Sequence, residues 1–525
     1  MHHDFSRQAA TGAVAALLVL AGVGPVAAQS DQSPVVEPSR QVTMDARPDR
    51  LFNHPVLAVD PTNPEPVVLA VGDSRNGGCR LHVSNDGGLT FAPAAKTFMP
   101  DELPYCIQLN FGPAIDLAFA PDGQLYIATA GSSLKTGHPR GPVDALTIRT
   151  SDLGATTESF TVEKAREIPY MAAGQNETGV SSLGNNTVAV DTKDPNRIYR
   201  SFRYRTRGPS AGDRPRVAVS NDRGATWAKS IDPFDELGND VYGGDLPMLA
   251  AGPGGVVYGF TRERLRPAPA GQPANTKQRV FMSKSTDGGQ TWKTTVAFDD
   301  ARDLSDPGVA VDPRNGNVYG VFESQVANGT EHVFFMSSSD QGRTWSKPVD
   351  IIDDPGKLHS HSVPGVSVAP DGRVDVAWYD FRADPFFTPG SNLKQRYADV
   401  YMATSGDEGR SWSPNIRVSD RSIDTTIGAS FDNEDVRGPM GIASTKDTTF
   451  VTWSDSRAGA LPEFDVEDAY FTRVRFHAAA ADEERSGLDM KSAVAGSGVA
   501  LATAGLLLLL ATRLRRTSGR SRTAG

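Results

Sequence analysis

One eight-residue phrase recurs along the chain and constrains its fold more than any other feature. The pattern is Ser-x-Asp-x-Gly-x-Thr-Trp, and its clearest copy runs from Ser285 to Trp292. Further copies begin at Ser84, Ser220, Ser338 and Ser405, and a degenerate copy begins at Thr150. The copies stand roughly 50 to 70 residues apart, within or just above the spacing of repeat architectures. The chain is therefore predicted to be built from repeated units.

Each copy has the composition of a tight turn between two β-strands. An aspartate side chain can accept hydrogen bonds from backbone N–H groups two or three residues further on. The glycine can take a positive φ, which a Cβ would penalise. The final aromatic residue can begin the next strand and bury a large apolar surface. We therefore expect a structural role for the aspartates of the six copies, Asp86, Asp152, Asp222, Asp287, Asp340 and Asp407.

The phrase resembles the Asp-box, also called the bacterial neuraminidase (BNR) repeat, of sialidases and several other β-propeller families. The resemblance implies an all-β, sialidase-like propeller. It is specific for the fold and much less specific for an activity. A calcium loop is not favoured, because the dense Asp/Asn ladder and the closing Glu of such loops are missing around Asp86 and Asp287.

A second phrase, strand–turn–strand with Asp-Pro or Asp-Gly at the turn, precedes each box. It occurs seven times, at 55–71, 114–129, 187–204, 248–260, 308–322, 365–378 and 440–453. Four strands per unit make a propeller blade, so seven blades are predicted, with the six of sialidases as the alternative. The last unit lacks a box and a fourth strand, and residues 40–44 could supply that strand and close the ring.

The two ends of the chain predict export and a membrane anchor. Arg7, an apolar stretch at 13–23 and small residues at 26–28 are typical of a signal peptide over 1–28, with a retained anchor as the alternative. The propeller is assigned to 29–477 and a charged stalk to 478–491. The uncharged segment Ser492–Thr512 is long enough for a transmembrane helix. Five arginines in 513–525 predict a cytoplasmic C-terminus, with the propeller outside.

Charge and cysteine content narrow the possible partners. The formal net charge is −10, and without the five arginines of the tail it is about −15, which argues against nucleic-acid binding. The only two cysteines, Cys79 and Cys106, are predicted to form a disulfide in an oxidising compartment. No cofactor and no metal site are predicted. The expected partners are a glycan or a protein, and the membrane.

The motif Asp-x-Arg recurs at the end of the second strand of three units. Its arginines are Arg75, Arg382 and Arg457. In a four-stranded meander this end lies on the face opposite the boxes, where long loops also gather. Arginines there could hold a carboxylate or phosphate by paired hydrogen bonds. Alternatively, each Asp–Arg pair could brace neighbouring blades.

The resemblance to sialidases implies a tyrosine nucleophile activated by a glutamate, an aspartate acid/base and three carboxylate-binding arginines. From their placement, we assign Tyr379, Asp380 and Glu434 as catalytic candidates and the three arginines as ligand-binding candidates. Tyr397 and Glu323 are further candidates. The chain departs from the family because the Phe/Tyr-Arg-Ile-Pro motif before the first box is missing. The nearest string, Arg-Glu-Ile-Pro at 166–169, follows the second box.

Other polar clusters leave the choice of function open. Carboxylates crowd 299–306 and 432–435 and could support glycoside cleavage at suitable separations, although such loops are more often solvated. His54, His359 and His361 each precede a first strand and are interpreted as loop histidines. Two function classes follow. The first is a non-catalytic propeller that binds glycans or proteins. Exposure of Phe386 and Phe387 would favour this function. The second is a sialidase-like exo-glycosidase.

Overall fold

The structure is a computed structural model, and its strands belong to one compact unit, Pro34–Phe476. It describes residues 33–44, 51–60, 62–73, 77–92, 99, 105–106, 108–109, 112–113, 115–132, 143–150, 153, 164–167, 187–205, 213–240, 248–263, 277–302, 304, 307–354, 356, 358–386, 396–428, 440–459 and 466–476. The predicted signal peptide, stalk, transmembrane segment and tail lie outside these residues. Within them, no helix is long and apolar enough to cross a membrane.

Seven antiparallel sheets make up the described part of the chain, together with the small pair β7–β8. The first strands of blades 1 to 7 are β3 (Phe52–Val59), β9 (Asp116–Phe119), β13 (Thr187–Val190), β16 (Met248–Ala251), β20 (Gly308–Val311), β24 (His361–Val368) and β29 (Gly441–Ser444). The second strands are β4 (Val67–Asp73), β10 (Leu125–Ser132), β14 (Ile198–Arg205), β17 (Val257–Arg262), β21 (Val318–Gln325), β25 (Val374–Asp380) and β30 (Thr448–Asp455). The third strands are β5 (Gly78–Ser84), β11 (Val143–Thr150), β15 (Asp213–Ser220), β18 (Lys277–Ser285), β22 (Glu331–Ser338), β26 (Tyr397–Ser405) and β31 (Asp468–Arg475).

The fourth strands and the remaining elements are shorter. Fourth strands in blades 2, 4, 5 and 6 are β12 (Lys164–Glu167), β19 (Lys293–Arg302), β23 (Val349–Asp350) and β27 (Ile416–Arg417). The others are β1 (Val35–Val36), β2 (Arg40–Gln41), β6 (Tyr105–Cys106), β7 (Gln108–Leu109), β8 (Gly112–Pro113), β28 (Ile423–Asp424) and the 3₁₀ helix η2 (Asp235–Asp240).

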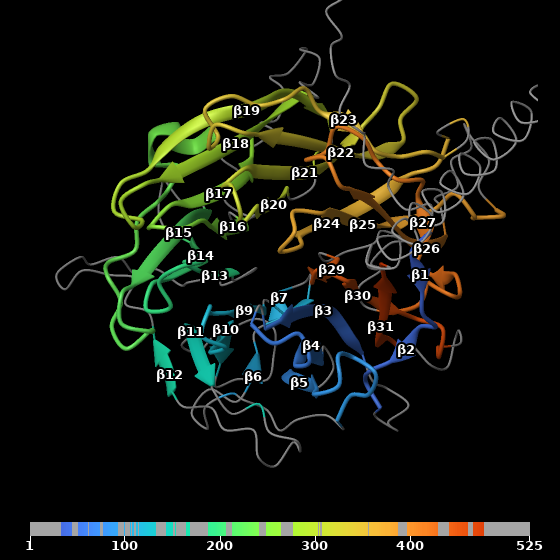
Figure 1. Cartoon of the computed structure of the whole chain (residues 1–525), viewed down its shortest axis with the longest axis horizontal. Helices are drawn as coiled ribbons and strands as arrows, with labels where there is room; N and C mark the ends of the chain where they lie inside the picture. The colour runs from blue at the N-terminus through green and yellow to red at the C-terminus, as the bar shows by residue number, and fades with distance from the viewer. Residues whose placement is uncertain are drawn as a thin grey trace, which may run out of the picture. The chain divides into compact units, whose positions relative to one another are not determined.

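The first strands of the seven sheets follow one another around a common centre, as Figure 1 shows. β3 contacts β9 and β29, and the intervening neighbours along the ring contact each other in chain order. The second strands are the most deeply buried, and every described residue of β4 and β25 is buried. This arrangement is a seven-bladed, all-β propeller, so the seven-blade prediction is confirmed and the six-blade alternative is not.

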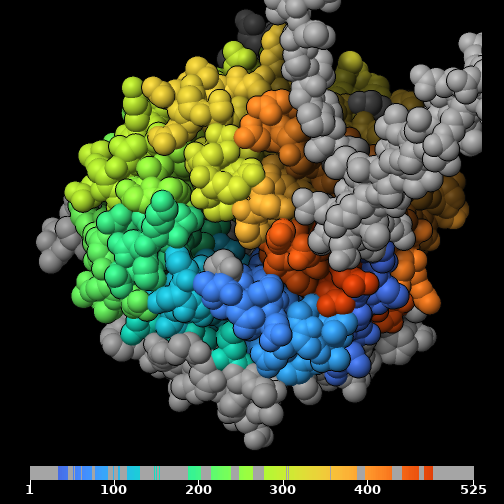
Figure 2. Space-filling view, viewed as in Figure 1, coloured from blue at the N-terminus to red at the C-terminus, as the bar shows by residue number. Residues whose placement is uncertain are grey.

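Segments from both ends of the propeller meet in blade 7, which closes the ring. Arg40 and Gln41 pair with β31, as predicted, and Val35 and Val36 pair with β31 as well, which was not predicted. Arg473 of β31 binds the carboxylate of Glu37 at 2.6 Å and the carbonyl oxygen of Gly87 in blade 1. Figure 2 shows the last blade in orange-red against the first in blue. The edge strands of an open sheet are thereby removed.

The box turns form the same hydrogen-bond network in each of the five copies that the structure describes. In the copy at Ser285, the carboxylate of Asp287 accepts from the backbone N–H of Thr291 at 2.9 Å and from its hydroxyl at 2.6 Å. The hydroxyl of Ser285 donates to Asp287 and accepts from the N–H of Gly289, whose φ is +83°. These hydrogen bonds outweigh burial and lower the pKa of Asp287 to about 2. The copy around Asp152 lies mostly outside the described residues.

The aromatic residue that ends each box packs against the preceding blade. Trp412 of blade 6 meets Phe335 of blade 5 edge to face, with ring centroids 4.9 Å apart. Phe91 of blade 1 meets Phe471 of blade 7 in the same way at 5.0 Å. The boxes therefore fix the contacts between blades in addition to turning the chain.

Replacing Asp287 by Ala is expected to lower the free energy of unfolding by about 1–2 kcal/mol, because the turn loses several hydrogen bonds that close it. Asp287→Asn should cost less, because one side-chain oxygen remains as an acceptor. Gln290→Ala, in the same turn, changes an exposed side chain and serves as the control. Chemical unfolding followed by tryptophan fluorescence measures all three. Equal stability of Asp287→Ala and the control would contradict a structural role for the box.

A disulfide joins Cys79 of β5 in blade 1 to Cys106 of β6, which pairs with β10 in blade 2. The two Cα atoms are 5.7 Å apart, and both residues are buried in one hydrophobic cluster with residues of both blades. The bond therefore ties together the first two blades.

Candidate functional site

The face opposite the box turns carries the ends of the second strands and the starts of the first and third. The register of blade 6 shows this, because Val374 lies opposite the box residue Ser405 while Asp380 lies opposite Asp399 at the other end. Asp73, Asp380 and Asp455 close the second strands of blades 1, 6 and 7 on this face. The Asp-x-Arg motifs therefore share one face, while Arg75 itself lies outside the described residues.

Arg382 is held between blades 5 and 6 by polar groups on several sides. Its Nη2 atom lies 2.8 Å from Asp380, its Nη1 donates to Asp353 at 2.8 Å, and Nη2 also donates to the side-chain oxygen of Asn415. The guanidinium carbon stacks 4.3 Å from the centre of the Tyr401 ring. Although burial opposes the charge, the carboxylates raise the pKa of Arg382 above its usual range. Its side chain is only 14% exposed.

Arg457 of blade 7 repeats this arrangement. Its Nη2 donates to Asp455 at 2.7 Å, Nη1 donates to Asp420, and the guanidinium stacks 4.1 Å from the centre of the Tyr470 ring. The indole N–H of Trp453 donates to Asp455, as that of Trp378 does to Asp380 in blade 6. The two described arginines of the predicted carboxylate-binding set therefore brace blades and already bind carboxylates of the protein.

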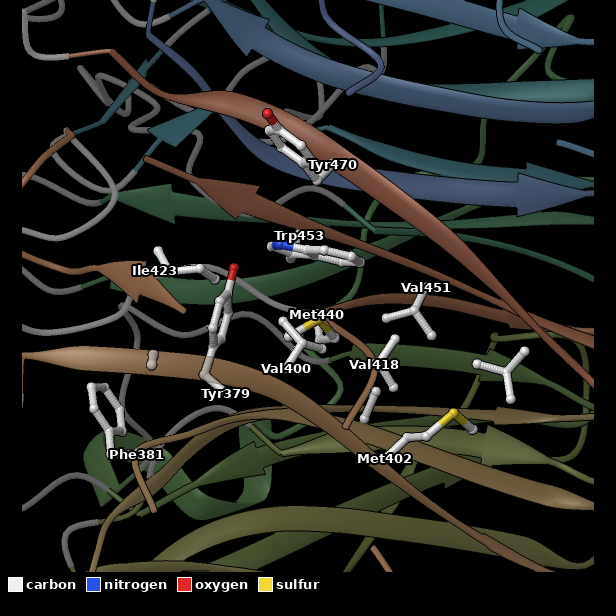
Figure 3. Close-up of a cluster of buried hydrophobic side chains, with 13 residues drawn as sticks. Tyr379, Phe381, Val400, Met402, Val418, Ile423, Met440, Val451, Trp453 and Tyr470 are labelled. Carbon is white, nitrogen blue, oxygen red and sulfur yellow. The ribbon is translucent and has the colours of Figure 1, made fainter. Parts of the chain in front are cut away.

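Tyr379 lies in the apolar cluster between blades 6 and 7 (Figure 3). Its hydroxyl accepts a hydrogen bond from the backbone N–H of Ser454 at 3.1 Å, and the residue is 3% exposed. Burial, together with the nearby carboxylates of Glu467 and Asp455, raises the pKa of this hydroxyl far above its usual range. These surroundings suit a buried tether between blades, and they oppose the phenolate that a nucleophile requires.

Glu467 is a carboxylate that we did not single out in the sequence. It precedes β31 and is fully buried, and its backbone forms an isolated parallel β-bridge with Leu51 of blade 1. A Cβ placed on Gly428 would lie 2.9 Å from its Oε2 atom, so the chain passes very close to this carboxylate. Glu434, the predicted activating glutamate, lies outside the described residues. The sequence offered no local signal for Glu467, because its neighbours Leu51 and Gly428 are distant in the chain.

An exposed aromatic residue, Phe386, lies on the loop between the second and third strands of blade 6, beside the half-buried Tyr397 that begins β26. Phe386 is 61% exposed and is the one aromatic residue among the exposed large hydrophobic side chains of the described chain. Its ring centroid lies 5.6 Å from that of Tyr397, at an interplanar angle of 36°. Arg396 lies beside this pair, with its guanidinium carbon 5.2 Å from the centre of the Tyr397 ring. We call Phe386, Tyr397, Arg396 and Asp424 the aromatic platform.

Asp424, itself part of the platform, and the neighbouring Asp384 hold its other residues in place. The Nε and Nη2 atoms of Arg396 donate to the two carboxylate oxygens of Asp424 at 3.0 and 2.6 Å. The buried Asp384 accepts hydrogen bonds from the backbone N–H groups of Phe386, Arg396 and Tyr397, so it joins both ends of the loop. The Asp-Pro pair at 384–385 is a turn signal in the sequence. The Arg396–Asp424 contact spans 28 positions and carried no such signal.

Of the predicted loop histidines, His359 and His361 lie in polar surroundings between blades 5 and 6. The loop prediction was wrong for two of the three, because His54 lies within β3 of blade 1 and His361 begins β24. His361 is fully buried, with Nε2 3.5 Å from the carboxylate of Asp380 and its ring 5.3 Å from that of His332. Burial lowers the pKa of His361 to about 4, although Asp380 acts in the opposite direction. His359 shares a 3.0 Å hydrogen bond with Asp354. Among the described residues, no cluster of His, Cys, Asp or Glu has the arrangement of a metal site.

The predicted carboxylate clusters belong only in part to the described residues. Asp299 and Asp300 lie exposed on β19, and Asp300 forms an ion pair with Lys277. The group at 432–435 lies outside the described residues. Glu323 accepts a hydrogen bond from the backbone N–H of Val363 in the next blade at 2.9 Å. The described carboxylates thus lie on two strands, β19 and β21.

Asp116 is a further carboxylate that the sequence did not single out. It begins the first strand of blade 2, and its oxygens accept from the N–H groups of Leu117 and of Val188 in blade 3. Burial of the carboxyl group outweighs these hydrogen bonds and the nearby Arg200, and raises the pKa of Asp116 to about 7. A carboxyl with such a pKa is able to exchange a proton near neutral pH.

One curated protein is similar to part of this chain. The chain is 27% identical over 302 residues to a xyloglucanase of Hypocrea jecorina (strain QM6a), a match that covers 45% of this chain and 33% of that protein. The chain thus matches only about a third of the length of this relative. No protein-family profile matches the chain.

Several solved structures resemble the chain. A protein of unknown function from Dyadobacter fermentans DSM 18053 gives a TM-score of 0.44 at 12% identity, covering 85% of this chain and 99% of that one. A Hadza microbial sialidase gives a TM-score of 0.40 at 15% identity, and the match covers 78% of this chain and 76% of that one. An α-L-arabinofuranosidase of Fusarium graminearum gives a TM-score of 0.41 at 13% identity, and the match covers 66% of this chain and 92% of that one. These TM-scores lie below 0.5, and the likenesses carry no inference about this chain.

Proposed function

We propose that this chain is an exported, membrane-anchored propeller that binds glycans through the face opposite its box turns. The anchor is the segment Ser492–Thr512, and the signal peptide is 1–28. The observation that carries the binding role is the exposed aromatic platform. A flat ring such as Phe386 can cover the C–H face of a sugar, while the planar Arg396–Asp424 pair beside it can hydrogen-bond to hydroxyl groups.

Two further features support binding rather than sialidase chemistry. Arg382 and Arg457 already bind protein carboxylates, and the hydroxyl of Tyr379 is buried with a raised pKa. The partial similarity to a xyloglucanase fits a glycan ligand, and xyloglucan is therefore the first ligand to test.

Phe386→Ala is expected to weaken glycan binding at least tenfold, because an exposed aromatic anchor at the centre of a contact typically contributes more than about 1.4 kcal/mol. The control is Leu89→Ala, which removes an exposed apolar side chain from a box turn on the other face. Binding of the full chain, purified in mild detergent, is measured by calorimetry against xyloglucan oligosaccharides and the leading ligands of a glycan array. Unchanged affinity in Phe386→Ala would refute the platform as the binding site.

The second candidate function is an exo-glycosidase, and the observation that favours it is Asp116. Its pKa of about 7 is that of a group able to donate a proton at neutral pH. A panel of fluorogenic sialosides and other aryl glycosides separates the two functions. The binding proposal expects no turnover, whereas turnover that is lost in Asp116→Asn would establish the hydrolase.

A further inference from the structure

The arginines on the face opposite the box turns are a first guide to the kind of glycan that fits there. A sialic acid or uronic acid carries a carboxylate, which proteins usually bind with an arginine that presents free N–H groups. In blades 6 and 7, four described arginines on this face lie in ion pairs, Arg382, Arg396, Arg417 and Arg457, while a fifth, Arg421, is exposed three positions before Asp424. Each of the first four already forms an ion pair with at least one aspartate.

Carboxylates outnumber these arginines. The aspartates that contact the four arginines or hold their loop are Asp353, Asp380, Asp384, Asp399, Asp420, Asp424 and Asp455. Although burial acts in the opposite direction, hydrogen bonds from Arg457 and Arg396 hold the pKa of Asp420 and of Asp424 below the usual range. Both are therefore ionised at neutral pH. Among the described residues of this face, seven aspartates therefore stand against five arginines, and this excess of negative charge repels anionic ligands.

The contacts of the platform itself suit an uncharged sugar. Phe386 offers an apolar ring to solvent. The two N–H groups of Arg396 that point at Asp424 are fully used, so the pair acts as a neutral unit that can share hydrogen bonds with hydroxyl groups. An incoming carboxylate that approaches Arg396 also meets the negative charge of Asp424.

We propose that this face selects neutral glycans and rejects sialylated and uronic-acid glycans. The inference rests on the proposed glycan-binding function and adds the class of ligand to it. It also separates this chain from sialidase-like recognition, which the box turns alone would suggest.

The test is an array in which each neutral glycan is printed beside its sialylated or uronic-acid counterpart, probed with the full chain in mild detergent. We expect the neutral member of a bound pair to bind at least tenfold more tightly. The difference should shrink as the salt concentration rises from about 50 to 500 mM, because salt screens exposed charges.

A double variant tests the cause of the selectivity. Asp353→Asn with Asp420→Asn removes two exposed negative charges while the buried partners of Arg382 and Arg457 remain. It should bind acidic glycans several-fold more tightly than the original chain and neutral glycans equally well. As a control, Asp287→Asn removes one charge from the opposite face and should leave the selectivity unchanged.

The outcomes separate the two proposals. If the chain binds no member of any pair, both the glycan-binding function and this inference fail. If it binds glycans but prefers the acidic members, or if the double variant leaves the selectivity unchanged, only the inference fails.

Discussion

Acidification from pH 6.5 to pH 4 is expected to lower the free energy of unfolding by several kcal/mol. Two fully enclosed histidines, His82 and His361, are responsible, with exposed fractions of 1% and 0%. Burial lowers the pKa of each from its usual 6.5 to about 4. The charge of Arg80 adds to this effect at His82.

The direction follows from the protons that each state binds. Between pH 6.5 and 4 the unfolded chain has protonated histidines while the folded chain keeps both neutral, so acid favours unfolding. Since one pKa unit corresponds to about 1.4 kcal/mol, each histidine accounts for a loss of about 3 kcal/mol over this range. Asp116 acts in the opposite sense over the same range, because its raised pKa adds stability as the pH falls from about 7, and it offsets the loss from about one of the two histidines.

The measurement is a series of urea unfolding curves between pH 4 and 7. His361→Gln cannot take up a proton, so its stability should fall less steeply with acid than that of the original chain. His359→Gln is the matched control, because His359 lies two positions away, is partly exposed and is bonded to Asp354. A slope that is identical in His361→Gln and in the original chain would show that His361 is not kept neutral by the fold.

Most of the fold could be predicted because its signals are local. The Ser, Asp, Gly and Thr of a box lie within seven positions, and the turn between a first and a second strand is equally short. The closing contact of blade 7 was only partly foreseen. A strand as short as Val35–Val36 has no periodicity of its own, and its partner β31 lies more than 400 positions away.

The candidate site was predicted less well, for a physical reason. The Asp-x-Arg motif was visible, but the sequence could not say whether its arginines face a ligand or a neighbouring blade. The sequence did contain a signal that the arginines face a neighbouring blade. Trp378 stands two positions before Asp380, as Trp453 does before Asp455, and alternate residues of a strand share one face. A buried indole beside the aspartate indicates that the pair is internal.

Replacing Asp380 by Ala is the substitution expected to destabilise the propeller most, by about 3–5 kcal/mol. The carboxylate is fully buried and accepts from the indole N–H of Trp378 and from the backbone and side chain of Arg382. Its loss leaves a largely buried guanidinium with the exposed Asp353 as its remaining carboxylate partner, and an indole N–H without its acceptor. Thermal and urea unfolding followed by tryptophan fluorescence measure the loss.

Asp353→Ala is the matched control, because it removes the other carboxylate from the same arginine. Asp353 is 45% exposed, and exposed ion pairs typically contribute less than about 1 kcal/mol, so the two variants should differ by at least 2 kcal/mol. Such a difference would identify the Asp380–Arg382 pair as a brace between blades. Similar small losses in both variants would instead show that Arg382 is free to turn towards a ligand, and they would restore it as a candidate for binding a sugar carboxylate.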